Sequence, residues 1–215
     1  MFKKNDTIVF YGDSITSSSK TNPEGSLTWD GLGSGYVNMI NSYYLLYKPE
    51  LNLRIINQGI SGNRTEDLIK RLDSDVLSYN PNYVFIMIGV NDAWRMFDCP
   101  QIPEFKISNE KYRNNLLYLV KKIIASGSKV VLMSPFYLET NLSNPLRNKI
   151  DQYVAIMEEI AAEYNLLFIN LQKSFDELLE KVLVFSLSAD RVHLNMAGNM
   201  YLRDEILRFL TAKNK

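Results

Sequence analysis

The sequence has very little of what metal sites and disulfide frameworks require. Its 215 residues include one histidine, His193, and one cysteine, Cys99. A single cysteine excludes an internal disulfide framework. A zinc site built from several histidine or cysteine ligands is excluded as well, so we expect no metal and no cofactor. If the chain transfers protons near neutral pH, His193 is the candidate group.

The chain also lacks a surplus of either charge and any long apolar run. Lys+Arg and Asp+Glu number 24 each, whereas nucleic-acid and membrane-surface partners usually require a basic excess. No apolar run is long enough to cross a bilayer. Residues 1–6 have neither the apolar core nor the cleavage site of a signal peptide. We therefore expect no nucleic-acid partner, no membrane partner and a cytoplasmic location.

Short apolar runs alternate with longer helical patterns along the chain. The length suits one domain, residues 1–215. The β-α-β-α order predicts an α/β fold, with about five mostly parallel strands and helices on both faces of the sheet. Two long stretches, 16–35 and 98–107, have no assigned element, and long loops of this kind are often functional. We expect strands at 7–11, 53–57, 83–88, 129–133 and 166–169, and helices at 36–47, 65–79, 108–126, 145–164, 174–182 and 196–212.

Polar clusters follow the predicted strands at the points where the strands end. The first strand is followed by Gly12-Asp13-Ser14, the second by residues 59–63 and the third by residues 89–92. A fourth cluster, residues 190–193, precedes the last helix. Ligands of open α/β sheets bind beyond the carboxyl ends of the strands. We therefore expect these four segments to meet at one site.

The residue types in these clusters fit acyl transfer by a serine nucleophile. A serine hydroxyl needs a base to become reactive, and an imidazole both supplies that base and later protonates the leaving alcohol. A carboxylate on the other ring nitrogen fixes the tautomer and stabilises the imidazolium. Ser14, His193 and Asp190 fit these three roles. Because Asp190 and His193 are three positions apart, one tight turn can present both.

The oxyanion of an acyl-transfer reaction needs convergent N–H donors. The candidates are the backbone N–H groups of Ser14 and Gly62 and the side-chain amide of Asn91. Gly62 has no side chain to keep the backbone away from a substrate. Structural roles stay open for these residues and their neighbours. Asn91 and Asp92 also suit an ordinary turn, and Asp13 suits a turn-former that hydrogen-bonds nearby backbone.

The motifs Gly12-Asp13-Ser14, Gly62, Asn91 and Asp190-x-x-His193 resemble the block motifs of the SGNH (GDSL-type) hydrolases. They occur in the same order and span nearly the whole chain. The resemblance implies a flavodoxin-like, three-layer α/β/α fold. It also implies that Ser14, Asp190 and His193 form the catalytic triad, and that Ser14, Gly62 and Asn91 form the oxyanion hole.

Several longer segments resemble the intracellular bacterial acetylxylan esterases in particular. This resemblance implies removal of acetyl groups from xylo-oligosaccharides, hence an acetylated saccharide as substrate, and an assembly of identical subunits. The proline that usually follows the histidine is Leu194 here. That change leaves the ring nitrogens unaffected, but it could shift the backbone that sets the geometry of Asp190 and His193. The segments are Gly31–Val37, Gly59–Asn63, Met87–Arg95, Ser134–Tyr137 and Asp151–Tyr153.

Aromatic side chains stack on sugar rings, and several lie in or beside the expected site. Core packing or subunit contact is the alternative for each of them. These aromatic residues are Trp29, Tyr36, Trp94 and Tyr137. As candidates for substrate contact we take Asp13, Asn63, Trp94 and Tyr137.

Three other functions remain open at this stage. The same chemistry could act on another short acyl ester, as in a lysophospholipase or a thioesterase. A carbohydrate-binding protein could retain the fold without catalysis. A flavodoxin-like nucleotide binder is disfavoured, because the loop after the first strand lacks a phosphate-cradling glycine pattern such as GxxxxGK[ST]. No long apolar groove for a fatty chain is evident, which disfavours a lipase.

Overall fold

Five parallel strands form one sheet in the computed structural model, which describes residues 2–20 and 29–212. Their order is β2-β1-β3-β4-β5, and every neighbouring pair is parallel. The mostly parallel five-stranded sheet expected from the sequence is thus confirmed. The strands are β1 (Thr7–Gly12), β2 (Arg54–Gly59), β3 (Tyr83–Met87), β4 (Lys129–Met133) and β5 (Leu167–Ile169).

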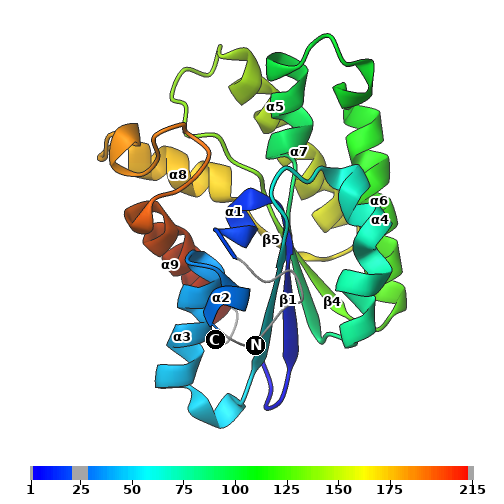
Figure 1. The fold of residues 1–215 in the computed structure, drawn as a ribbon, viewed down its shortest axis with the longest axis vertical. Helices are drawn as coiled ribbons and strands as arrows, with labels where there is room; N and C mark the ends of the chain where they lie inside the picture. Colours follow the sequence, from blue (N-terminus) through cyan, green and yellow to red (C-terminus); the bar gives the residue numbers. More distant parts are fainter. Residues whose placement is uncertain (1, 21–28, 213–215) are drawn as a thin grey trace.

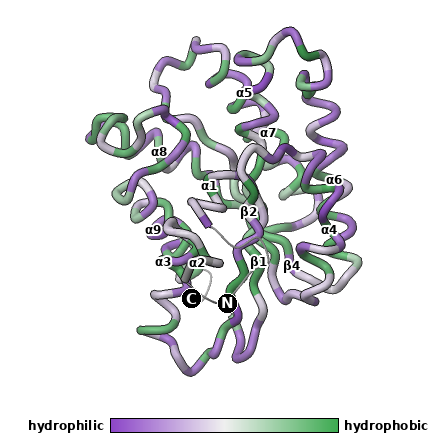
Figure 2. Tube along the Cα trace, in the orientation of Figure 1, coloured by the Kyte–Doolittle hydropathy of each residue, from purple (hydrophilic) through white to green (hydrophobic). Residues whose placement is uncertain are grey.

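The central strands β1 and β3 are buried on both faces. Their apolar runs lack polar alternation, as is typical of parallel strands covered on both sides. Every residue of β3 is buried, and so are the β1 residues from Ile8 to Gly12. Figure 2 shows hydrophobic residues along the strands of the sheet and hydrophilic ones toward the outer helices and loops. Burial of this apolar surface is the main term that stabilises such a core.

Two helical layers cover the sheet (Figure 1). Helices α3 (Tyr36–Tyr47) and α9 (Met196–Ala212) pack against each other on one face. On the other face, α6 (Asn109–Ala125) packs between α4 (Thr65–Asp75) and α7 (Pro145–Glu163). The three-layer α/β/α architecture is therefore confirmed.

No helix in the described ranges is long and apolar enough to span a bilayer.

Shorter elements form the connections between the strands and the long helices. The short α-helices are α1 (Ser14–Ser17), α2 (Trp29–Leu32), α5 (Val90–Asp98) and α8 (Leu171–Leu179). Single 3₁₀ turns occur at η1 (Pro49–Leu51), η2 (Leu77–Tyr79), η3 (Pro103–Phe105) and η4 (Val184–Ser186).

Local signals in the sequence located most of the long helices. The bounds of α3 and α9 are those expected. Ser108 caps α6, because its hydroxyl oxygen accepts the N–H of Lys111 at 3.1 Å. Asn144 caps α7 and is followed by Pro145 at the first helical position. In each case the chain supplies an acceptor for backbone N–H groups that have no partner within the helix.

Five helices differ from the expectation, and two of them, α1 and α2, lie in or overlap the stretch 16–35 that had no assigned element. Helix α4 ends at Asp75, and the 3₁₀ turn η2 completes the stretch to Tyr79. Helix α8 begins at Leu171, three residues earlier than expected, because Asn170 caps it by accepting the N–H of Lys173 at 3.0 Å. Helix α5 was not expected either, and the unassigned stretch 98–107, which begins at its last residue, contains η3. Of the other unassigned stretch, residues 21–28 lie outside the described residues.

The order of the strands places the candidate site segments together. Strand β1 lies between β2 and β3. The chain passes from β1 to β2 on one side and then crosses back to β3 on the other side, so the winding direction reverses at β1. A crevice forms at such a switch point, beyond the carboxyl ends of the strands. Only glycine fits at the end of β1, because a Cβ at Gly12 would lie 2.5 Å from both the Met87 carbonyl oxygen and the Thr16 hydroxyl. Ser14 follows two residues later, at the start of α1.

Candidate active site

The position of Ser14 is fixed by a tight turn between β1 and α1. Asp13 precedes the helix, and its Oδ1 accepts the N–H of Ile15 at 3.0 Å. The Asp13 side chain is buried under this turn. The hydrogen bond holds the first turn of α1 against the end of β1, so the Ser14 side chain projects from the edge of the sheet.

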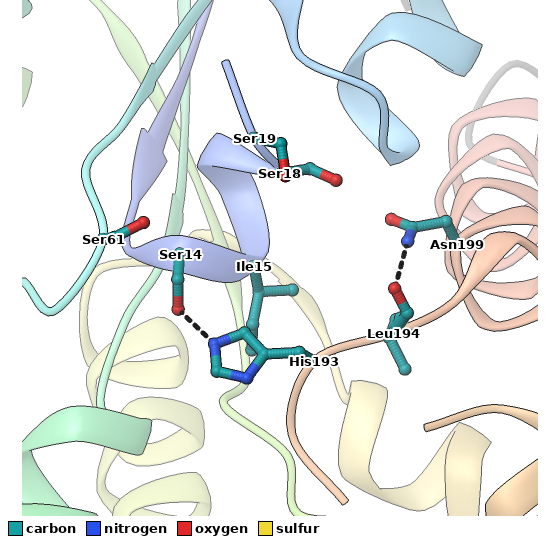
Figure 3. Close-up of a pocket in the computed structure, with 8 residues that line it drawn as sticks. All are labelled: Ser14, Ile15, Ser18, Ser19, Ser61, His193, Leu194 and Asn199. Carbon is teal, nitrogen blue, oxygen red and sulfur yellow. Dashed lines mark hydrogen bonds between the residues drawn. The ribbon is translucent and has the colours of Figure 1, made fainter. Parts of the chain in front are cut away.

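Ser14, His193 and Asp190 form a continuous hydrogen-bonded chain. The Ser14 Oγ lies 2.9 Å from His193 Nε2 (Figure 3), and His193 Nδ1 lies 2.6 Å from Asp190 Oδ2. A carboxylate only accepts hydrogen bonds, so Nδ1 carries the ring proton and Nε2 accepts from the serine hydroxyl. This is the tautomer that a general base needs in order to take a proton from the hydroxyl of Ser14.

The backbone of its own loop holds the Asp190 carboxylate. Asp190 Oδ1 accepts the N–H groups of Val192 at 3.0 Å and His193 at 2.8 Å. The Ser188 hydroxyl donates to the same oxygen at 3.1 Å. Partial burial opposes ionisation, but the hydrogen bonds from His193 and Val192 outweigh it and lower the pKa of Asp190 to about 2. Asp190 is therefore ionised at neutral pH.

Arg191, between Asp190 and His193, has a left-handed backbone conformation, with a φ of 68°. Residues other than glycine adopt this region at an energetic cost. Two contacts hold Arg191 there. Its carbonyl accepts the N–H of Leu138 at 2.9 Å, and its guanidinium pairs with Glu139. The loop after β4 thus contacts and stabilises the loop that carries Asp190 and His193.

Asn91 and Gly62 lie on the segments that follow β3 and β2, the two strands that flank β1. Asn91 is buried in the first turn of α5, and its Nδ2 donates to the carbonyl oxygen of Asn63 at 3.0 Å. This contact orients the amide, whose nitrogen carries a second hydrogen. Gly62 has a φ of 80°, and a Cβ there would meet nothing within 4 Å. A side chain at position 62 is therefore disfavoured by conformation rather than by space.

Two buried carboxyl groups lie behind this surface. Burial, with a smaller contribution from the nearby Asp92 charge, raises the pKa of Asp13 to about 7 against the opposing effect of the hydrogen bond from Ile15. Burial also raises the pKa of Asp92, to about 6, against hydrogen bonds from Thr65. Both Asp92 oxygens accept the Thr65 N–H at 3.1 Å, and Oδ1 also accepts the Thr65 hydroxyl at 2.6 Å. Asp92 therefore ties α5 to the start of α4.

A cavity of about 230 Å³ opens beside Ser14 and His193 (Figure 3). Most of its other lining side chains are polar, and no sequence pattern indicated them. Two of them, Ser18 and Ser19, follow the end of α1 and have positive φ angles, which are uncommon for serine. The carbonyl of Leu194 accepts from Asn199 Nδ2 at 2.9 Å, which fixes the backbone after the histidine without a proline. The other lining residues are Ile15, Ser18, Ser19, Ser61, Leu194 and Asn199.

The candidates for substrate contact lie in different surroundings. The Trp94 ring is 6.2 Å from the His193 ring between centroids, so it lies beside the reacting groups. Tyr137 is partly buried, and its backbone N–H donates to Gln172 at 2.8 Å. Asn63 Oδ1 accepts from Arg71 Nε at 2.7 Å. Asp13 is buried, as described above.

Two other aromatic residues, Tyr36 and Trp29, lie near the site segments in the sequence. Tyr36 is fully buried, and its hydroxyl lies 2.9 Å from that of Thr16, so it packs in the core. The side chain of Trp29 lies outside the described residues. Across residues 2–20 and 29–212, no group of three or more His, Cys, Asp or Glu side chains is arranged to hold a metal ion.

Comparison with known proteins identifies relatives over almost the full length. A family model described as GDSL-like Lipase/Acylhydrolase matches residues 10–200. An acetylxylan esterase from Geobacillus stearothermophilus is 39% identical over 203 residues, which cover 94% of this chain and 93% of that protein. An uncharacterized lipoprotein, YqeF, from Bacillus subtilis (strain 168) is 32% identical over 133 residues, or 60% of this chain and 48% of that protein.

Solved structures show the same fold. The crystal structure of Axe2, an acetylxylan esterase from Geobacillus stearothermophilus, aligns with a TM-score of 0.93 at 38% identity and covers 97% of this chain and 95% of that one. LAE5, an alpha/beta hydrolase enzyme from the metagenome of Lake Arreo, Spain, has the same TM-score at 33% identity, with 97% and 96% covered. Catalytic mutants of Axe2 that replace a serine, an aspartate and a histidine with alanine have also been solved.

Proposed function

The chain belongs to the family of GDSL-like lipases and acylhydrolases, and on that premise we propose that it is a serine esterase that removes acetyl groups from xylo-oligosaccharides or related glycans. The observation that carries the proposal is the chain of hydrogen bonds from Ser14 through His193 to Asp190 at the mouth of a small cavity. The similarity to acetylxylan esterases over nearly the whole chain supports the substrate.

In the first step, the Ser14 Oγ attacks the carbonyl carbon of the ester. His193 Nε2 takes the hydroxyl proton as the new C–O bond forms. The resulting imidazolium carries its second proton on Nδ1, where the ionised Asp190 carboxylate stabilises it. A base and an orienting carboxylate are thus already aligned before substrate arrives, which supports the assignment of these three residues as the triad.

The carbonyl oxygen gains negative charge in this step and needs donors. We assign this role to the backbone N–H groups of Ser14 and Gly62 and to the second N–H of the Asn91 amide. Such donors contribute most when they are held in place before the reaction. The burial of Asn91 and its bond to the Asn63 carbonyl support this assignment.

The tetrahedral intermediate collapses when His193 donates its proton to the sugar oxygen, which leaves as an alcohol. Ser14 then carries the acetyl group. Water attacks this ester with His193 as base, and collapse of the second intermediate returns the proton to Ser14 Oγ and releases acetate. Each proton passes through the same ring nitrogen, so the mechanism needs no other titrating group.

The cavity suits a short acyl group attached to a polar alcohol. Its volume is about 230 Å³, and hydroxyl groups of Ser18, Ser19 and Ser61 line it. These groups can hydrogen-bond sugar hydroxyls, whereas a long acyl chain would require an apolar lining. We propose that Trp94 stacks on a sugar ring next to His193. Contacts of Tyr137, Asp13 and Asn63 with substrate stay predictions.

Three wider expectations accompany this function. We propose that residues 1–215 act as one hydrolase domain, which the family match over residues 10–200 supports. An assembly of identical subunits is also expected, and exposed apolar side chains at the end of α3, Leu45 to Tyr47, offer a contact surface. The cytoplasmic location stays a prediction.

The proposed function is tested by product analysis on acetylated xylo-oligosaccharides. We expect acetate release by the native protein, and a loss of about 10⁴-fold or more in kcat for Ser14→Ala, because the nucleophile is gone. Asn91→Ala should lower kcat about 10²–10³-fold with little change in KM. NMR of the oligosaccharide pool identifies the acetyl groups removed.

Other sugar acetates and longer acyl esters serve as comparison substrates. A faster rate on long acyl chains or thioesters would reject the saccharide substrate and keep the serine mechanism. No turnover of any ester, with no labelling of Ser14 by an organophosphonate, would reject catalysis and leave a binding protein.

A further inference from the structure

An arginine on α4 contacts the segments that carry the proposed oxyanion donors. The Arg71 side chain is only 13% exposed, and its Nη1 donates to Asp75 at 2.8 Å. Its guanidinium carbon lies 4.4 Å from the centre of the Tyr11 ring. A cation withdrawn from water in this way is stable only if its donors are satisfied. The partners of Arg71 therefore define where its guanidinium can lie.

The remaining donors of Arg71 reach the ends of two strands and the loop beyond them. Nη2 donates to the carbonyl oxygens of Gly12 at 2.9 Å and Gln58 at 3.0 Å. Nε donates to Asn63 Oδ1 at 2.7 Å. A guanidinium is planar, and its donors form a rigid fork. It therefore fixes the positions of these three acceptors relative to one another.

Each proposed oxyanion donor is linked to one of these acceptors, either as a near neighbour in the sequence or through a hydrogen bond. Ser14 follows Gly12 by two residues, and Gly62 immediately precedes Asn63. The Asn63 carbonyl oxygen is the acceptor for the Asn91 amide at 3.0 Å. Displacement of Asn63 would therefore move the N–H of Gly62 and release the amide of Asn91 together.

We propose that Arg71 is a positioning residue that keeps the oxyanion donors aligned, a role that rests on the proposed esterase function. Arg71 acts through Gly12 and Asn63 and touches neither the substrate nor the reacting atoms. Asp75 holds the guanidinium from the opposite side. The side chain of Asn63 serves this link, which is a different role from contact with a sugar.

The proposal is tested with two variants that break the link to different extents. Arg71→Lys keeps the charge but loses the fork, and Asn63→Ala removes one acceptor while Arg71 retains Asp75 and both carbonyls. We expect a 10- to 100-fold lower kcat on an acetyl ester for each, with KM changed less than threefold. Arg113→Met is the matched control, since Arg113 forms two ion pairs, with Glu159 and Glu163, that lie outside the site. Its kcat should be unchanged.

Coupling to Asn91 separates a positioning role from general damage to the fold. In an Asn91→Ala background only the effect through the N–H groups of Ser14 and Gly62 remains, so Arg71→Lys should lower kcat further by a smaller factor than it does in the native protein. Residues that act as a unit are non-additive in this way. The pH at which kcat/KM falls on the acid side should stay that of the native protein, because the contacts of His193 are intact.

The outcomes are distinct. Full kcat for folded Arg71→Lys and Asn63→Ala would overturn the positioning role, and so would losses that multiply with that of Asn91→Ala. A rise in KM alone for Asn63→Ala would assign Asn63 to substrate contact and would also overturn it. If Ser14→Ala and Asn91→Ala themselves keep full activity, the esterase function fails first, and the result differs from a failure of the Arg71 variants alone.

Discussion

The two halves of the site are held in place by different means. The proposed oxyanion half consists of Ser14, Gly62 and Asn91. These residues follow the ends of β1, β2 and β3, with buried partners behind them. The acid–base half is a loop on which 49% of the His193 side chain and 41% of the Asp190 side chain are exposed. Tertiary hydrogen bonds fix the first half, and local bonds within one turn fix most of the second.

The difference is visible in the state of the carboxyl groups. In the oxyanion half, burial raises the pKa of Asp13 to about 7 and that of Asp92 to about 6. In the acid–base half, partial burial of Asp190 is outweighed by hydrogen bonds from His193 and Val192, and its pKa is lowered to about 2. The two carboxyl groups of the oxyanion half accept hydrogen bonds that join structural elements, whereas the carboxyl group of the acid–base half is ionised at neutral pH.

The largest effect is expected for Asp190→Asn, in the exposed half. The NH2 group of an asparagine can donate to His193 Nδ1, so the ring proton is no longer held on Nδ1. The proton then lies on Nε2, which can no longer accept the proton of Ser14. We expect kcat to fall on the order of 10³–10⁴-fold. Stability should change little, because this side chain is well exposed. Steady-state kinetics and a urea unfolding curve measure the two effects.

The pH profile gives an independent check of this assignment. Because the pKa of Asp190 is lowered to about 2, its carboxylate stays ionised from neutral pH down to about pH 3, and activity lost on the acid side above pH 4 does not come from Asp190. The corresponding contribution to stability is present above its usual pKa of 3.8 and is lost as the pH falls through 2. An Asp190→Asn variant with native kcat would contradict the triad.

The same contrast explains how much of the molecule could be predicted from the sequence. Strand β3 was predictable because its five residues are all apolar or aromatic, and Asn144-Pro145 marks the start of α7. Helix α5 was missed, since its first residues include Asn91 and Asp92, which suit a turn equally well. In the folded chain Asp92 binds Thr65, 27 positions away, and such a partner leaves no local signal.

Within the site, residue types and order predicted the segments that meet, but not what supports them. Ser14 and His193 stand out because a serine after a strand and a lone histidine have few alternative chemical roles in combination. Arg71, Arg191 and Glu139 gave no such signal. Each is an ordinary charged residue in the sequence, and its importance depends on the loops that the fold brings against it.

A smaller effect on kcat is expected when the contact between Arg191 and Glu139 is removed in the acid–base half. Arg191 adopts a left-handed conformation that costs about 1–2 kcal/mol and is held by Glu139. Both Arg191→Ala and Arg191→Gly lose this ion pair, and we expect about tenfold lower kcat for each. Only glycine relieves the backbone cost. The free energy of unfolding, measured with urea, should therefore be about 0.5–1 kcal/mol higher for Arg191→Gly than for Arg191→Ala, after the larger chain entropy of glycine in the unfolded state is counted.

Glu139→Gln isolates the ion pair from the backbone effect. It should reduce kcat only a few-fold, because the Leu138 N–H still binds the Arg191 carbonyl. Equal stabilities of the glycine and alanine variants would show that the left-handed conformation is not a constraint. Full activity of all three variants would show that the local bonds of Asp190 are sufficient to hold the loop.

In the oxyanion half, Asp13→Asn is expected to change the pH dependence of stability. Burial raises the pKa of Asp13 from 3.8 to about 7, so the folded protein holds this proton more tightly than the unfolded chain. The stability from this group is fully present below about pH 4 and is lost as the pH rises through 7. An asparagine Oδ1 can still accept the Ile15 N–H and never ionises. The variant should therefore lose less stability than the native protein between pH 4.5 and 7.5.

Urea unfolding at those two pH values measures the change, expected to be about 1 kcal/mol or more, since one pKa unit corresponds to about 1.4 kcal/mol. Asp73→Asn makes the same substitution at an exposed position of α4 and serves as the control. Its pH dependence should match that of the native protein. If Asp13→Asn matches it too, Asp13 ionises without cost in the folded state, and burial is then not what distinguishes the carboxyl groups of the two halves.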